Sequence, residues 1–82
     1  MTCYSIELYD KDNDMYSDSF ICRTEDEARL VASCLKDLVK QDLIVNRYNG
    51  RCEPYDWVEV YKNSIVDGRL VLENIDVYSD EE

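Results

Sequence analysis

The apolar residues of this 82-residue chain change their spacing twice, and this change constrains the fold more than any other feature of the sequence. Near both ends, apolar side chains alternate with polar ones, as in half-buried β-strands, whereas between residues 24 and 40 they recur every three or four positions, as in an amphipathic helix. A chain of this length forms one domain with a modest core. The pattern therefore predicts a single α+β domain over residues 1–82, in the order ββαββ, with a small antiparallel sheet and one helix packed on one face.

The first strand pair is predicted from alternation on both sides of an acidic turn. Residues 3–9 alternate between an apolar and a mixed face, and residues 10–14 have the composition of a turn. Residues 15–22 then form a returning strand, with Phe20 and Cys22 on one side and Ile21 on the other. The two strands are expected to form a hairpin.

The helix is predicted to begin at Thr24, because Glu27 three positions later completes a capping box. Its apolar stripe consists of Ala28, Val31, Ala32, Leu35, Leu38 and Val39. Residues 43–45 either extend this helix or begin a short strand, and Asn49-Gly50 is typical of a tight turn. The structure of residues 42–55 is left open, with a further short hairpin as one alternative.

The last third of the chain is predicted to be a hairpin closed by Asp67-Gly68. Pairing outward from this turn sets Val60 opposite Ile75 and Val58 opposite Val77, on the apolar face that would receive the helix. The other face carries aromatic, acidic and amide side chains: Trp57, Glu59 and Tyr61 across from Tyr78, Asp76 and Asn74. Near the turn the alternation shifts, which predicts a bulge close to residues 62–64.

Charge is the main guide to function. The chain contains 19 acidic and 9 basic residues, so its formal net charge is −10. Such an excess attracts basic surfaces and repels the phosphates of nucleic acid, so we expect a basic protein as partner and no direct binding to nucleic acid. A hydrophobic content of 45% is too high for a disordered acidic segment. Only residues 79–82 are expected to fray as an acidic tail.

A partner-binding surface is predicted from the acidic turn, the polar face of the last hairpin and the tail. Glu59 opposite Asp76 would place like charges across a strand pair, which costs stability, and the neighbouring aromatic residues are common interface anchors. The alternative is that this face is only solvated and that Trp57 is covered by residues 43–55. The predicted partner-binding residues are Asp10, Asp12, Asp14, Asp18, Trp57, Glu59, Tyr61, Asp76, Tyr78 and Asp80.

No metal or other cofactor is predicted. Asp10, Asp12 and Asp14 have the first three ligand spacings of an EF-hand loop, but Met15 stands where that loop needs glycine and Ile21 where it needs glutamate. The chain has no histidine, and its four cysteines form no Cys-x-x-Cys pair. We expect the cysteines to be buried free thiols.

Catalysis is not indicated by any motif. Without histidine, no side chains show a nucleophile and base spacing, and no glycine-rich phosphate loop is present. The N-terminal residues lack the features of a secretory signal, and no apolar run is long enough to cross a membrane. The expected protein is therefore a non-enzymatic, cytoplasmic binding protein.

In its size, acidity, lack of a catalytic motif and many tyrosines, the chain resembles the small phage-encoded inhibitors of bacterial defence, anti-CRISPR proteins in particular. The resemblance covers the whole chain as a class and involves no shared motif. It implies an inhibitor whose acidic surface occupies the nucleic-acid-binding groove of a basic effector, such as a CRISPR-associated nuclease, in the host cytoplasm. The alternatives are an immunity protein or antitoxin against a basic toxin, and a structural or regulatory subunit that associates with itself or with others through a sheet edge.

Overall fold

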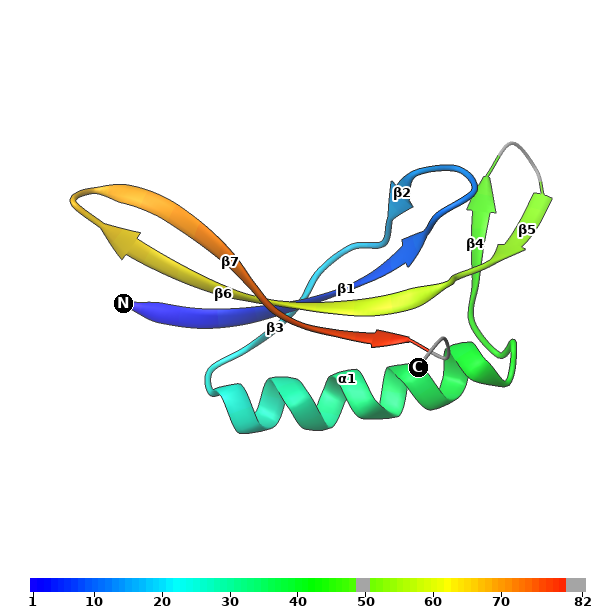
Figure 1. Ribbon diagram of the computed structural model, residues 1–82, viewed down its shortest axis with the longest axis horizontal. Coiled ribbons are helices and arrows are strands. Elements are labelled where there is room, and N and C mark those ends of the chain that lie inside the picture. The colour runs from blue at the N-terminus through cyan, green and yellow to red at the C-terminus, as the bar shows by residue number, and fades with distance from the viewer. Residues whose placement is uncertain (49–50, 80–82) are drawn as a thin grey trace.

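The computed structural model describes residues 1–48 and 51–79, and it describes the side chains of these residues except 46–48 and 51–53 (Figure 1). One helix, α1 (Glu25–Lys40), packs on one face of a five-stranded antiparallel sheet, which confirms the predicted α+β fold. The strands of this sheet are β1 (Thr2–Asp10), β2 (Met15–Tyr16), β3 (Phe20–Cys22), β6 (Trp57–Val66) and β7 (Arg69–Ser79). A separate two-stranded sheet contains β4 (Val45–Tyr48) and β5 (Arg51–Pro54).

Strand β1 lies at the centre of the large sheet, with β6 on one side and both β2 and β3 on the other. The predicted returning strand over residues 15–22 is therefore two short strands. Residues 17–19 separate them, but Ser17 still contacts β1, because its backbone N–H donates to the Leu8 carbonyl and its Oγ accepts from the Leu8 N–H, both at 2.9 Å. This pair of hydrogen bonds holds the interrupted strand against the sheet.

The predicted capping box is present. Thr24 Oγ1 accepts from the Glu27 backbone N–H at 3.2 Å, and the Glu27 carboxylate accepts from the Thr24 N–H at 3.1 Å. The helix ends at Lys40, so residues 43–45 do not extend it, and β4 and β5 form the further hairpin. Residues 49–50, where we predicted its turn, lie outside the described residues. No helix in the described part of the chain is both long and apolar enough to cross a membrane.

The core lies between α1 and the middle of β1 and β6. Its buried side chains are Ile6, Leu8, Ala28, Ala32, Leu35, Val39, Val58 and Val60. Two members of the predicted apolar stripe of α1 are not fully buried: Val31 is half-buried and Leu38 is exposed. The two alanines of α1, Ala28 and Ala32, are both completely buried, because their small side chains fit between the helix and the sheet.

The register of the β6–β7 hairpin differs from the predicted one. Lys62 pairs with Glu73 as expected, but Val60 pairs with Asp76, so Ile75 is an additional residue in β7. The bulge thus lies opposite Val60 and Tyr61 and not at residues 62–64. Because of this bulge, Ile75 packs against the core and Asp76 also points toward α1, where its Oδ2 lies 2.6 Å from Arg29 Nη1. The predicted pairs of Val60 with Ile75 and of Val58 with Val77 are therefore wrong.

Candidate functional site

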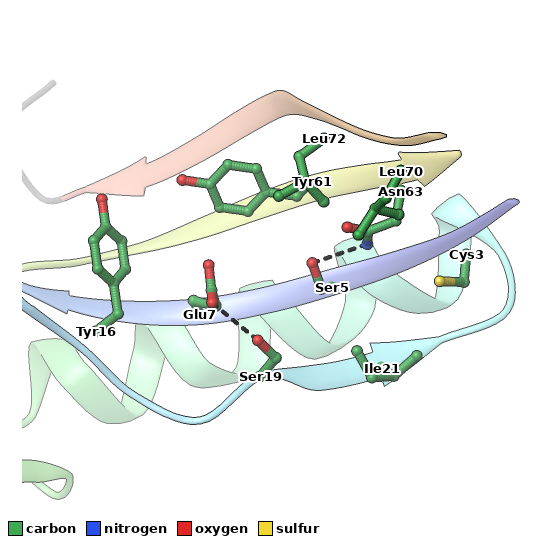
Figure 2. A pocket seen from close by; sticks show the side chains of 10 residues that line it. All are labelled: Cys3, Ser5, Glu7, Tyr16, Ser19, Ile21, Tyr61, Asn63, Leu70 and Leu72. Carbon is green, nitrogen blue, oxygen red and sulfur yellow. Dashed lines mark hydrogen bonds between the residues drawn. The ribbon is translucent and has the colours of Figure 1, made fainter. Parts of the chain in front are cut away.

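The sheet face turned away from α1, here called the outer face, carries a groove of about 570 Å³ (Figure 2). Strands β1 and β6 form its floor, and side chains from residues 16–21 and from β7 flank it. The lining residues are Cys3, Ser5, Glu7, Tyr16, Ser19, Ile21, Tyr61, Asn63, Leu70 and Leu72. On the floor, Asn63 Nδ2 donates to Oγ of the buried Ser5 at 3.0 Å. We call this site the outer groove.

Two carboxylates meet on the outer face. Glu7 and Glu59 are direct partners in the pairing of β1 with β6, so their side chains project from the same face. Glu59 is only 8% exposed; its Oε2 accepts from Trp57 Nε1 at 2.6 Å and its Oε1 accepts from the Tyr61 hydroxyl. Glu7 Oε1 accepts from Ser19 Oγ at 2.9 Å. Hydrogen bonds from neutral donors thus compensate for burial without cancelling the acidic character of the pair.

Within the part of the chain whose side chains are described, the only ion pairs are those of Arg29 with Glu25 and with Asp76. Arg29 lies on α1, on the other side of the sheet. No described lysine or arginine therefore neutralises Glu7 or Glu59. Like charges on directly opposite residues destabilise a strand pair, so the Glu7 and Glu59 pair lowers the stability of the fold.

Tyrosine and tryptophan rings surround the carboxylate pair. The Tyr9 ring lies 4.6 Å from that of Tyr16 and 4.8 Å from that of Trp57, measured between centroids. The Tyr9 hydroxyl donates to Asp14 Oδ1 at 2.7 Å, and this hydrogen bond, with burial and nearby charges, raises the pKa of Tyr9 to about 12. Burial and the hydrogen bond to Glu59 raise the pKa of Tyr61 as well. Both tyrosines stay protonated at neutral pH and act as hydrogen-bond donors.

The acidic turn residues do not act as a group. Asp10 is 1% exposed. Its carboxylate accepts hydrogen bonds from the backbone N–H groups of Asp12 and Asn13 and from Asn13 Nδ2, so Asp10 holds the turn together. The prediction that Asp10 belongs to an exposed binding surface is therefore wrong. Asp12, Asp14 and Asp18 are exposed, and Asp14 joins the aromatic cluster through Tyr9. Asp12 and Asp18 do not line the outer groove.

The predicted face of the last hairpin is divided by the bulge at Ile75. Trp57, Glu59 and Tyr61 lie on the outer face, as expected. Asp76 and Tyr78, however, pair with Val60 and Val58 and lie on the side of α1, where Asp76 forms its ion pair with Arg29 and Tyr78 packs against the core. The predicted opposition of Glu59 and Asp76 is wrong, since Glu59 pairs with Val77 in β7.

The C-terminal tail lies largely outside the described residues, and this includes Asp80. Ser79, where we expected fraying to begin, is the last residue of β7 and pairs with Trp57.

Tyr16 and Glu7 are the main site residues absent from the predicted set. Glu7 could have been found from the alternation of residues 3–9, because Glu7 and Tyr9 are two positions apart and so share the mixed face of that strand. Tyr16 could have been found by pairing outward from the acidic turn, because the structure has Asp10 opposite Met15 and Tyr9 opposite Tyr16. The interruption at residues 17–19, which brings Ser19 to Glu7, has no comparable signal in the sequence.

The described cysteines are free, but they are not fully buried as predicted: Cys3 and Cys22 are half-buried and Cys34 is exposed. The side chain of Cys52 lies outside the described residues. Burial is the main cause that raises the pKa of the Cys22 thiol, which makes it a poor nucleophile at neutral pH. Among the residues that the structure describes, no group of three or more Cys, Asp or Glu side chains is arranged to hold a metal ion.

Comparisons of the chain with protein-family models, with curated proteins and with solved structures found no match.

Proposed function

We propose that this protein is a non-enzymatic inhibitor that binds a basic protein through the outer groove. The observation that carries the proposal is the facing pair Glu7 and Glu59, which no described cation neutralises. An arginine or lysine side chain of a partner would relieve the repulsion between the two carboxylates and would form charge-assisted hydrogen bonds with Glu7. The rings of Tyr16 and Tyr61 line the same groove and offer cation–π contacts to that side chain.

The wider charge distribution supports the same role. A net charge of −10 steers a basic surface toward the protein over distances longer than direct contact, and makes association fast and sensitive to salt. Basic surfaces that bind nucleic acid present arginine and lysine to phosphates, so a protein that seats such a side chain between carboxylates competes with nucleic acid for the same groups. We therefore propose that the partner is a nucleic-acid-binding effector in the cytoplasm of a bacterial host and that the mechanism is competition.

The test is a pull-down from bacterial lysate with the full chain as bait, eluted over a salt series, with two variants beside the wild type. Glu7→Lys places a cation in the groove, where it repels a basic partner. The matched control is Asp37→Lys, which makes the same change of charge on the exposed face of α1. We expect Asp37→Lys to retain the partner and Glu7→Lys to lose most of it.

The captured protein is then purified and tested with a labelled nucleic acid that it binds. Displacement of the nucleic acid by the wild type, and not by Glu7→Lys, supports competition at its binding groove. If both variants bind equally well, or if the captured protein binds nucleic acid and the inhibitor at the same time, the proposal is wrong. Capture of a toxin whose active site is blocked would assign the protein to the immunity proteins instead.

A further inference from the structure

The far half of the β6–β7 hairpin extends beyond the N-terminal end of α1, so the helix does not cover it (Figure 1). Five apolar side chains of this arm are exposed, by 45% to 63%: Ile65, Val66, Leu70, Val71 and Leu72. Ile65, Leu70 and Leu72 lie on the outer face, and Val66 and Val71 alternate to the other face. Single exposed apolar residues are ordinary on a protein surface, but here both faces of one short arm carry them. Leu70 and Leu72 also form one wall of the outer groove.

This arm ends in an open backbone edge. In the described part of the chain, β7 pairs only with β6. The Ile65 N–H donates to the Met1 carbonyl at 3.3 Å, so the backbone of Ile65 faces β1 and not its β7 partner Leu70. In an antiparallel ladder the backbone groups of Leu70 must then point away from β6, and those of Leu72 and Asn74 follow by alternation. These groups can receive another strand.

The sequence of β7 is self-complementary around Val71. Arg69 and Glu73 each lie two residues from Val71 and carry opposite charges, and Leu70 and Leu72 are its immediate neighbours. We propose that β7 pairs with β7 of a second copy in antiparallel orientation, with the twofold axis at Val71. Arg69 then faces Glu73 of the second copy, and Leu70 faces Leu72 of the second copy, each twice.

Among registers near the centre of the arm, only this one combines backbone and charge complementarity. If the register were shifted by one residue, Leu70 would lie opposite Val71 of the second copy. The backbone groups of Val71 point back to β6, so this pair could not form hydrogen bonds between the two copies. A twofold axis at Leu70 would set Asp67 opposite Glu73 of the second copy, which are like charges. An axis at Leu72 would leave Arg69 opposite Ile75 of the second copy, without a counter-charge. The axis at Val71 avoids each of these conflicts.

The net charge of −10 does not prevent this association, because the arm itself is electrically balanced. Its charged residues are two basic and two acidic ones, Lys62, Asp67, Arg69 and Glu73. The acidic turn over residues 10–14 lies at the opposite end of the sheet in Figure 1, in a molecule 41 Å long. Charges separated by much more than the screening length of about 8 Å at physiological salt repel each other only weakly. Pairing through the arms directs the two acidic ends away from each other.

The dimer also has a consequence for the outer groove. A twofold axis between two antiparallel strands is perpendicular to the sheet, so the outer faces of both copies lie on the same side of one continuous sheet. Leu72 of the second copy packs beside Leu70 at the wall of the groove. Two grooves that open on one side can each hold a basic side chain of the same partner. Once one groove is occupied, the second side chain binds at a high effective concentration, so the partner binds the dimer more tightly than it binds one groove.

The experiment measures the molar mass of the full chain by sedimentation equilibrium, from micromolar to about millimolar concentration. We expect the wild type to form a dimer within this range. Arg69→Glu and Glu73→Arg each set like charges opposite each other twice, and both residues are exposed, so each variant should fold and dimerise at least about tenfold more weakly. An equimolar mixture of the two variants restores both opposite-charge pairs, so the mixture should dimerise like the wild type.

Circular dichroism and thermal unfolding of each variant show whether it is folded, and amide hydrogen exchange gives a second measurement on the wild type. Exchange at Leu70 and Leu72 should slow as the protein concentration rises, because their N–H groups become hydrogen-bonded in the dimer. A wild type that stays monomeric at every concentration would overturn the proposal. So would a dimer that neither single variant weakens, or one that the mixture of variants does not restore.

Discussion

Glu7 on β1 and Glu59 on β6 occupy directly opposed positions, and their carboxylates share the outer face of the sheet. Glu59 accepts hydrogen bonds from Trp57 and Tyr61, and Glu7 accepts one from Ser19. All three donors are neutral, so the hydrogen bonds orient the two carboxylates without removing their mutual repulsion. The Glu7 and Glu59 pair therefore lowers folding stability and is suited to bind a cation. A substitution that removes one of these carboxylates should increase stability and weaken cation binding.

Glu7→Gln is therefore expected to stabilise the fold. The substitution removes the repulsion from Glu59, while the amide oxygen of glutamine can still accept from Ser19 Oγ. We expect the free energy of unfolding to rise by about 0.2–1 kcal/mol at low salt, and by less at high salt, where the repulsion is screened. Urea unfolding measures this difference. The matched control is Asp37→Asn on the exposed face of α1, and a Glu7→Gln variant no more stable than this control would contradict the prediction.

The hydroxyl of Tyr61 is expected to contribute to stability through Glu59. Tyr61→Phe removes the donor to Glu59 Oε1 and leaves a carboxylate that is 8% exposed with one donor fewer. The loss of one hydrogen bond to a buried charged group costs about 1–3 kcal/mol. Tyr4→Phe removes the same atom from a tyrosine on the core side whose hydroxyl has no hydrogen bond in the described part of the chain. Chemical unfolding should show a larger loss for Tyr61→Phe, and equal losses would refute the role of its hydroxyl.

Tyr9 is expected to titrate with a pKa of about 12, because its hydroxyl donates to Asp14 and would leave an anion beside that carboxylate. Asp14→Asn should lower the pKa of Tyr9 toward the ordinary value of 10. Asparagine tolerates the positive φ of 50° at this position, so the turn should persist. The measurement is an NMR titration of the Tyr9 ring carbon that bears the hydroxyl, and a titration unchanged by the substitution would contradict this assignment.

The raised pKa of Tyr9 also makes stability depend on pH. Because the folded state binds the phenolic proton more tightly than the unfolded state, its contribution is fully present below pH 10 and is lost as the pH rises toward 12. Asp14→Asn should therefore reduce the steepness with which the free energy of unfolding falls in this window. An equally steep fall in both proteins would show that other groups dominate there.

Local sequence patterns predicted most of the helix and strands, whereas the side chains that reach the candidate site depend on a bulge and a turn that these patterns do not specify. The capping box at Thr24 and Glu27 marked the start of α1 because two side chains three residues apart satisfy each other's backbone N–H groups. Alternation alone does not reveal which residue of a strand is bulged, so the additional Ile75 moved Asp76 and Tyr78 to the other face. Likewise, composition marks residues 10–14 as a turn, but only the folded chain shows that Asp10 is buried as its acceptor.

The ion pair that Asp76 forms with Arg29 on the helix side of the sheet is expected to make a modest contribution to stability. Arg29 Nη1 lies 2.6 Å from Asp76 Oδ2, and both side chains are 37% exposed, so solvent screens their attraction. Arg29 also bonds Glu25 and Tyr78, and its pKa is raised by these partners, so Arg29→Met alone removes more than one interaction. A double-mutant cycle with Asp76→Asn isolates the pair and should give a coupling energy of about 0.2–1 kcal/mol. Strictly additive losses in urea unfolding would mean that Asp76 is held on the helix side by the bulge alone, without help from Arg29.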